Sequence, residues 1–119
     1  MSPTLSMRGL HQEYELWMSE LRFYQEELSI FAKYVGATSR CREELCKALD
    51  QCRDQNEVLQ HKLHRSEKAL VSLVHQMSGM GTDDIHMDNH MMLRKEMTRY
   101  RESYRDLKKG LRQVEPVSV

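Results

Sequence analysis

Large apolar residues recur along almost the whole chain with alternating spacings of four and three residues. The first run comprises Leu10, Tyr14, Trp17, Leu21, Tyr24, Leu28, Phe31 and Val35. The second comprises Leu45, Leu49, Cys52, Asn56, Leu59, Leu63, Ser66, Leu70, Leu73 and Met77, including two polar interruptions. The third comprises His86, His90, Leu93, Met97, Tyr100, Tyr104, Leu107, Leu111 and Val114. Because a seven-residue repeat keeps one apolar seam along a helix, the pattern predicts three long helices that pack seam to seam.

Breaks in the pattern predict where the helices begin and end. Gly36 is typical of a helix C-terminus, and Thr38 or Ser39 is a suitable N-cap for the next helix. A second break of small residues, Ser78 to Gly81, precedes Thr82, which is a further N-cap. We therefore expect helices over about 3–35, 39–78 and 82–114, followed by a short tail over 115–119.

Short connections between long helices favour antiparallel neighbours. The expected fold is all-α: one elongated, three-helix antiparallel (up-down-up) coiled-coil bundle spanning 1–119. At about 1.5 Å per residue, the middle helix would be roughly 60 Å long.

Charge and cysteine content narrow the functional classes. The 119 residues include 18 Lys plus Arg and 18 Asp plus Glu, for a net charge of zero. A balanced charge argues against a nucleic-acid partner and against a membrane-surface protein. Cys41, Cys46 and Cys52 are odd in number and contain no CxxC pair, so we expect no disulfide framework and a cytoplasmic location. No stretch of the chain is apolar enough to predict a signal peptide or a membrane span.

The charges are distributed unevenly between the helices. The first helix carries five Glu against three basic residues, whereas the segment from Arg94 to Arg112 carries eight basic residues against three acidic ones. Since the first and third helices of an up-down-up bundle run parallel, we expect acidic residues of the first to lie beside basic residues of the third.

Apolar residues beside the seam suggest a function in binding. They include Met18, Phe23, Ile30, Val58, Val71, Val74, Ile85 and Met92. Apolar side chains left exposed mark interaction surfaces, so we expect a non-enzymatic scaffold that associates with itself or docks another helical protein. Packing is expected to depend on Trp17, Leu21, Phe31, Leu59, Leu63, Leu93, Tyr100 and Leu107. No nucleophile elbow, Gly-rich phosphate loop or strand-to-helix turn supports an enzyme.

The alternative is a metal-binding bundle. His86 and His90 are four residues apart and therefore project from one helical face, as a chelating pair needs. Folding the chain at residue 37 and again near residue 80 brings His75 to the same end, with His90 level with residues around Thr4 and Met7. Imidazole and thioether ligands from the neighbouring methionines would suit copper or zinc rather than magnesium.

The same folding predicts a second metal cluster, made of His11, Glu15 and His64. For both clusters, the competing interpretation is that the histidines are hydrogen-bonded residues of an ordinary bundle.

Two tyrosines of the third helix, Tyr100 and Tyr104, lie among basic residues. Such a strip is typical of proteins that bind single-stranded nucleic acid. Acidic residues interleave with the basic ones, and both tyrosines belong to the seam, so a solvated helix face is the preferred interpretation.

Two segments carry a resemblance to known proteins. HQEYELWMSELRFYQEELSIF (11–31) and HMDNHMMLRKEMTRYRESYRDLKKGL (86–111) resemble short bacterial all-helical proteins, notably in an HxxxHxxLRxxM motif that opens the last helix. That resemblance implies a helical fold and leaves the function open. At the level of fold, three heptad-patterned helices with Trp17 on the seam are similar to a spectrin-type repeat.

Overall fold

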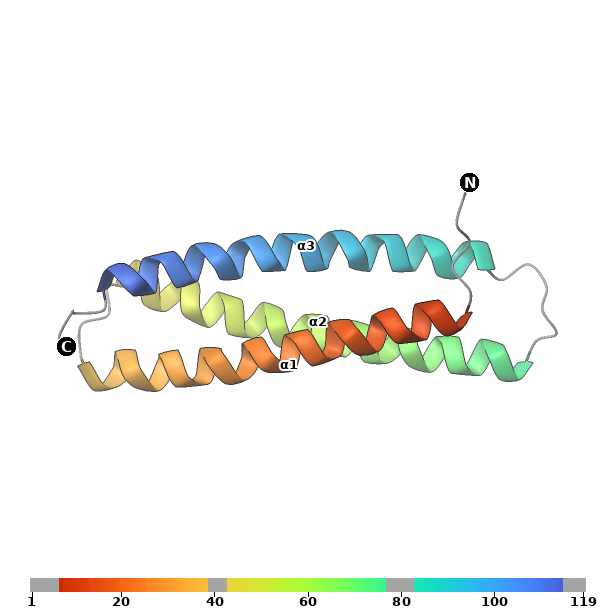
Figure 1. Ribbon diagram of the computed structural model, residues 1–119, viewed down its shortest axis with the longest axis horizontal. Helices are drawn as coiled ribbons and strands as arrows, with labels where there is room; N and C mark the ends of the chain where they lie inside the picture. The colour runs from red at the N-terminus through yellow and green to blue at the C-terminus, as the bar shows by residue number, and fades with distance from the viewer. Residues whose placement is uncertain (1–6, 39–42, 77–82, 115–119) are drawn as a thin grey trace.

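The computed structural model describes three α-helices and no residues outside them. They are α1 (Met7–Thr38), α2 (Glu43–Gln76) and α3 (Asp83–Val114). Figure 1 shows α1 and α3 running in the same direction and α2 running antiparallel to both. The expected all-α, up-down-up bundle is confirmed. Among the described helices, none is long and apolar enough to cross a membrane.

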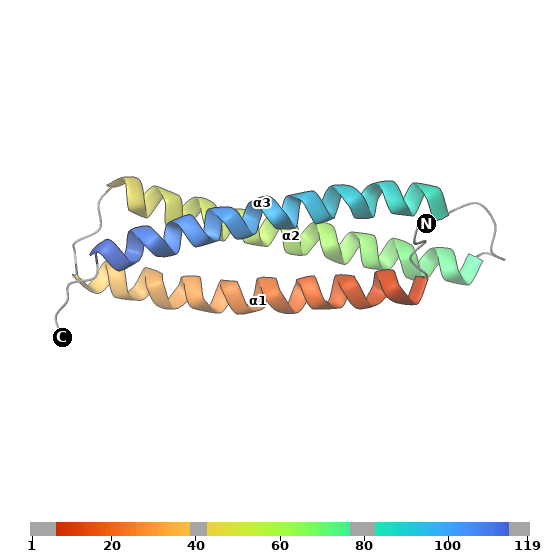
Figure 2. The ribbon, with the colours of Figure 1, turned by 45° about the horizontal axis from the view of Figure 1, so that its top comes forward.

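The molecule is an elongated rod that measures 60 × 27 × 22 Å. In both ribbon views α2 packs along each of its neighbours (Figures 1 and 2). The direct approach of α1 to α3 depends more on long side chains, as the ion pairs below show. The apolar seams of the three helices therefore face one another along the long axis of the rod, which is the packing expected of a seven-residue repeat.

The predicted seam residues form the core. Buried members include Leu10, Tyr14, Trp17, Leu21, Leu28, Leu49, Cys52, Leu59, Leu63, Leu70, Leu93, Met97, Tyr100, Tyr104 and Leu107. Of the residues expected to carry the packing, Phe31 alone is only partly buried, although it contacts the same core. Removing this apolar surface from water supplies the main favourable free energy of folding, at about 25 cal/mol per Å².

The prediction that Gly36 ends the first helix is wrong. α1 continues through Gly36 to Thr38, so Thr38 belongs to this helix and does not cap the next one. A glycine lowers helix propensity by only about 1 kcal/mol, which the packing of a 32-residue helix outweighs. The predicted helix boundaries at about 3, 39, 78 and 82, including the Thr82 N-cap, fall on residues outside the described ranges.

Both helix pairs are aligned differently from the expected folding: Leu21 of α1 contacts Asn56 of α2, and Ser66 of α2 contacts Asn89 of α3. His90 contacts Glu13, Tyr14 and Trp17 rather than residues around Thr4 and Met7. The shift is about two helical turns along α1.

Both polar interruptions of the α2 seam join all three helices. Asn56 is fully buried; its Nδ2 donates to the Leu21 carbonyl oxygen of α1 and to the Tyr100 hydroxyl oxygen of α3, each at 2.9 Å. Its Oδ1 accepts from Gln60 Nε2 at 2.6 Å. With every strong hydrogen-bonding group of the side chain used, this buried amide favours one alignment of the helices.

The second polar layer lies nearer the other end of α2. Ser66 Oγ accepts a hydrogen bond from Asn89 Nδ2 of α3 at 2.7 Å. Burial raises the pKa of the Tyr14 hydroxyl of α1, and hydrogen bonds to Asn89 and Ser66 partly offset that rise. Two polar layers thus interrupt the apolar core at positions that all three helices share.

The cysteines do not all behave as the sequence predicted. Cys52 is a buried free thiol, as expected of a seam residue. Cys46 is disulfide-bonded, so the expectation that the cysteines form no disulfide is wrong. Its partner is not among the described residues.

Candidate functional site

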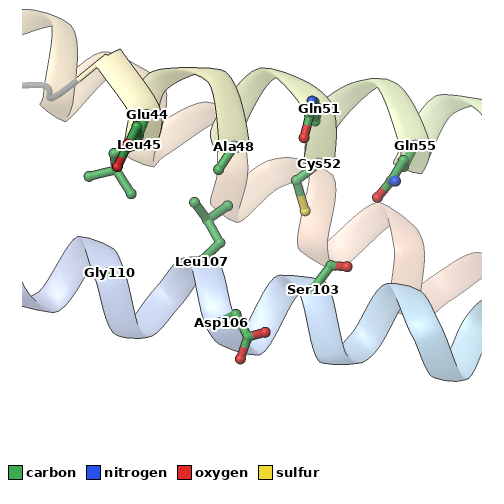
Figure 3. A pocket seen from close by; sticks show the side chains of 10 residues that line it. All are labelled: Glu44, Leu45, Ala48, Gln51, Cys52, Gln55, Ser103, Asp106, Leu107 and Gly110. Atoms are coloured by element: carbon green, nitrogen blue, oxygen red, sulfur yellow. The ribbon is translucent and has the colours of Figure 1, made fainter.

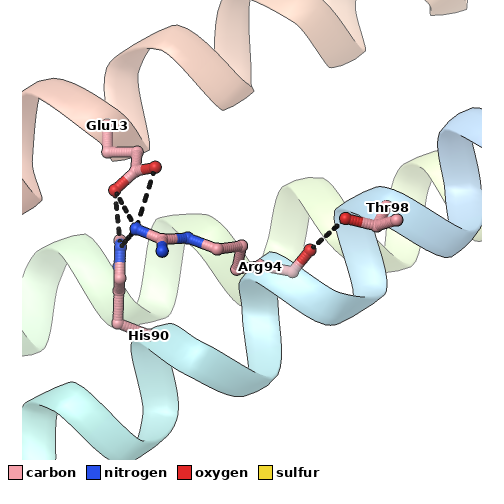
Figure 4. Close-up of polar contacts among 4 residues, drawn as sticks. All are labelled: Glu13, His90, Arg94 and Thr98. Atoms are coloured by element: carbon pink, nitrogen blue, oxygen red, sulfur yellow. Dashed lines mark hydrogen bonds and ion pairs between the residues drawn. The ribbon is translucent and has the colours of Figure 1, made fainter.

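A buried histidine at one end of the bundle is held by charged residues from two helices. His90 of α3 is completely buried, and its Nε2 lies 2.7 Å from Glu13 Oε1 of α1 (Figure 4). Because a carboxylate oxygen can only accept, Nε2 carries the hydrogen and donates it. Arg94, one turn along α3, donates from one terminal nitrogen to both oxygens of Glu13 at 3.0 and 3.2 Å.

Aromatic rings cover the same histidine. The Trp17 ring stacks on the imidazole, with centroids 4.9 Å apart and an interplanar angle of 18°. Tyr14 meets it edge-on at 5.3 Å. His90 Nδ1 is also buried, and no described residue hydrogen-bonds to it. The side chain therefore directs Nε2 at a carboxylate, while its Nδ1 has no hydrogen-bond partner among the described residues.

This arrangement resembles one half of a metal site. Histidines that bind metals commonly donate their other ring N–H to a carboxylate, which orients the ring and sets the tautomer. Glu13 occupies that position relative to His90. The side chains of His75 and His86, the other expected ligands, lie outside the described part of the chain. Met91 and Met92 are exposed, so these two methionines do not share the buried environment of His90.

The second predicted cluster forms with one different member. His11 Nε2 lies 3.3 Å from Glu15, and His11 Nδ1 lies 3.0 Å from Glu67 of α2. These three residues bring ligand atoms within 4.8 Å of one another, and His64 is not part of the group. Since Glu67 flanks the seam at the α1–α2 boundary whereas His64 projects outward and is exposed, the predicted role of His64 is wrong.

The geometry at His11 favours an ion-pair cluster over a chelate. Each ring nitrogen of His11 faces a different carboxylate, so the ring bridges Glu15 and Glu67. A metal bound by the two carboxylates and the histidine would use one ring nitrogen only. His11 and Glu15 are also largely exposed, which leaves water as a competing ligand.

Glutamates of α1 pair with basic residues of α3 at seven-residue intervals. Glu13 pairs with Arg94 at 3.0 Å, Glu20 with Arg101 at 2.6 Å, and Glu27 with Lys108 at 3.6 Å. The sequence separation is the same in all three pairs, as it must be for parallel helices with one register. The expected pairing of acidic α1 with basic α3 is therefore confirmed, and we call these pairs the charge ladder.

The central rung of the ladder is the most strongly bonded. Arg101 donates from Nε and a terminal nitrogen to the two oxygens of Glu20 at 2.6 and 2.9 Å. These hydrogen bonds lower the pKa of Glu20 despite its partial burial. Tyr24 also donates to Glu20 at 2.7 Å, and burial, with this bond, raises the pKa of Tyr24 to about 12.

A hollow of about 430 Å³ lies between α2 and α3. Figure 3 shows Leu107 pointing from α3 toward Ala48 of α2, with the Cys52 sulfur directed into the gap. Small residues line much of it, including Ser103 and Gly110. Burial raises the pKa of the Cys52 thiol, which disfavours the thiolate needed for nucleophilic chemistry. The hollow therefore does not present an activated cysteine.

A row of exposed apolar side chains runs along the outside of α1. Leu16, Phe23 and Ile30 are 68%, 56% and 63% exposed and lie seven residues apart. The sequence reasoning noted Phe23 and Ile30 but missed Leu16. It also missed the pairing of Glu13 with His90. The seven-residue spacing of Leu16, Phe23 and Ile30 was the available signal for this row, which we call the α1 stripe.

Comparison of the chain with protein-family models, with curated proteins and with solved structures found no match. The resemblances inferred from the sequence motifs accordingly stay predictions, and function has to be argued from the geometry.

Proposed function

We propose that this protein is a non-enzymatic interaction module that associates with a second copy of itself through the α1 stripe. The observation that carries the proposal is the row of Leu16, Phe23 and Ile30, which are more than half exposed at a constant seven-residue interval. Side chains spaced in this way lie on one face of a helix. An apolar row on an otherwise charged surface is a typical site of helix docking.

The stripe suits a second copy because it is symmetric about its centre. If two α1 helices cross antiparallel at Phe23, Leu16 of one copy lies opposite Ile30 of the other. These side chains are similar in size and both are aliphatic, so one surface serves both partners, as a two-fold interface requires. Three apolar residues per copy bury little area, and we therefore expect a weak, concentration-dependent dimer.

Sedimentation equilibrium over a range of protein concentrations tests the proposal. The parent protein should shift from monomer to dimer as its concentration rises, and Phe23→Glu should remain monomeric. Val58→Glu is the matched control, because Val58 is about equally exposed but lies on α2. A parent that stays monomeric at the highest concentration would exclude self-association, and docking of another helical protein would then be the remaining interaction function.

A metal-binding function is the second candidate, supported by the buried Nδ1 of His90, which has no partner among the described residues, and by the Glu13 carboxylate on its Nε2. Copper or zinc would suit an imidazole ligand of this kind, with His86 one turn earlier on α3 as the second ligand. Metal content of protein purified without an affinity tag is the measurement. Stoichiometric metal that disappears in the His86→Ala, His90→Ala variant supports this function, and substoichiometric metal in the parent excludes it.

The cellular compartment is a further part of the proposal. The small number of cysteines favours a reducing cytoplasm, whereas the disulfide at Cys46 favours an oxidising compartment. We retain the cytoplasm, where reducing conditions would open the Cys46 disulfide that the structure contains. Thiol titration of the denatured protein, isolated rapidly with an alkylating agent present, should then find three free thiols per chain. A single free thiol per chain would contradict a cytoplasmic location.

A further inference from the structure

A second hollow, lined mostly by basic residues, lies between Tyr24 of α1 and the C-terminal half of α3. Its volume is about 380 Å³. It is lined by Tyr24, Arg101, Tyr104, Arg105, Lys108, Lys109 and Arg112. Five of these seven residues carry a positive charge at neutral pH, and none is acidic. We call this feature the basic hollow.

Most of this positive charge is not compensated by the described residues. Arg101 is neutralised by Glu20, and Lys108 lies 3.6 Å from Glu27. No described residue forms an ion pair with Arg105, Lys109 or Arg112. The basic hollow therefore retains three positive charges that form no ion pair with a described residue.

The spacing of these cations is unfavourable for the helix itself. Arg105 and Lys109 are four residues apart, and Arg112 follows three residues later, so all three share one face of α3. Like charges at these spacings repel. The negative end of the helix dipole favours Arg112, which lies in the last turn, but its effect fades before it reaches Arg105. The helix dipole therefore favours only the last of these three cations.

A tyrosine hydroxyl at the same place also has no partner. Tyr104 is only 5% exposed, and its hydroxyl oxygen is buried without a hydrogen bond from or to any described residue. The Lys108 ammonium lies 5.7 Å from the centre of the Tyr104 ring, and the centroids of the Tyr24 and Tyr104 rings are 4.2 Å apart. A buried hydroxyl without a partner among the described residues is unfavourable, and Tyr104 is a lining residue of the basic hollow.

We propose that the basic hollow binds a small soluble anion with two or more phosphate groups. Its volume lies within the range of small-molecule sites. Arginine guanidinium groups bind phosphate oxygens through paired N–H donors, and Arg105 and Arg112 both have these donors available. A monophosphate carries too little charge to compensate three cations, whereas a di- or triphosphate matches them. The inference concerns α3 and is independent of the α1 stripe.

Calorimetric titration with inorganic tripolyphosphate at physiological salt tests this proposal. The parent should bind one tripolyphosphate per chain, and more tightly than orthophosphate. The triple variant Arg105→Gln, Lys109→Gln, Arg112→Gln should bind at least about tenfold more weakly. The control variant Lys68→Gln, Lys95→Gln, Arg99→Gln removes the same charge from exposed positions outside the hollow, and its affinity should stay within about threefold of the parent.

Three results would overturn the proposal. One is a parent that does not bind tripolyphosphate; another is a control variant that loses as much affinity as the triple variant, since binding would then reflect overall charge. The third is tighter binding to a single-stranded oligonucleotide through the same residues, which would assign the cluster to nucleic acid. If circular dichroism shows that the triple variant has lost helix, the single change Lys109→Gln at an exposed position replaces it, with the same expected direction.

Discussion

Asn56 of α2 donates a hydrogen bond to the Tyr100 hydroxyl oxygen of α3 while also donating to the Leu21 carbonyl oxygen of α1. One buried amide thus contacts all three helices near the middle of the rod. Burial is the largest cause of the strongly raised pKa of Tyr100, and the hydrogen bond from Asn56 partly offsets it. The phenol therefore stays neutral over the physiological pH range.

Removing the amide should lower stability. Asn56→Ala leaves the Tyr100 hydroxyl without its buried donor and creates a cavity, so we expect a loss of about 2–3 kcal/mol in the free energy of unfolding. Urea denaturation measures this loss, and Gln55→Ala at the exposed neighbouring position is the control. A loss below that of the control would mean that the polar layer contributes nothing to stability.

Replacing Asn56 by leucine should have a different effect. An apolar residue of similar size restores packing, so stability should be unchanged or higher, but the constraint on helix alignment is lost. We expect broadened or duplicated amide resonances in NMR spectra of Asn56→Leu, from more than one register. A single sharp set of resonances would show that the flanking contacts suffice to specify the register.

The Glu20–Arg101 rung should couple α1 to α3 measurably. Because both side chains remain about one-third exposed, we expect a coupling of about 1 kcal/mol in a double-mutant cycle of Glu20→Gln and Arg101→Gln. The exposed pair of positions Glu26 and Lys95 serves as the control cycle and should show no coupling. Equal values in the two cycles would contradict a specific interaction.

Acid should weaken the protein through the same carboxylate. Hydrogen bonds from Arg101 hold the pKa of Glu20 below its ordinary value of 4.5. The folded state therefore releases this proton more readily than the unfolded state, so the stabilisation is present above pH 4.5 and is lost as the pH falls through the lower folded pKa. Between pH 7 and about pH 3, the free energy of unfolding should fall less in Glu20→Gln than in the parent. An equal fall would assign the acid sensitivity to other groups.

Gly110→Ala should stabilise the bundle. A Cβ at Gly110 would lie 3.2 Å from Leu45 Cδ1, a terminal methyl group that can move by a few tenths of an ångström. The gain in helix propensity, about 0.5–1 kcal/mol, should exceed the cost of that shift. Thermal unfolding monitored by circular dichroism measures whether the unfolding midpoint rises. A lower midpoint would show that α2 and α3 pack too closely here for a methyl group.

The sequence by itself determined the helices, their seams and the direction in which they run. Burial of Leu21, Leu63 and Met97 follows from a periodicity that is visible within each helix, because the side chains that share a helix face depend only on local geometry. The glutamates of α1 and the basic half of α3 likewise predicted which two helices form ion pairs with each other. The sequence signals for helix ends were weaker, because tertiary packing extends α1 beyond Gly36.

Only the tertiary structure decided which residues of different helices meet. The contact of His90 with Glu13, and the presence of Glu67 rather than His64 beside His11, depend on where each turn lies, and a shift of a few residues at one turn changes every partner along the rod. The exposure of the α1 stripe and the clustering of cations in the basic hollow also depend on the tertiary structure. A seven-residue repeat specifies which face of a helix is buried, but the alignment between helices is a property of the assembled bundle.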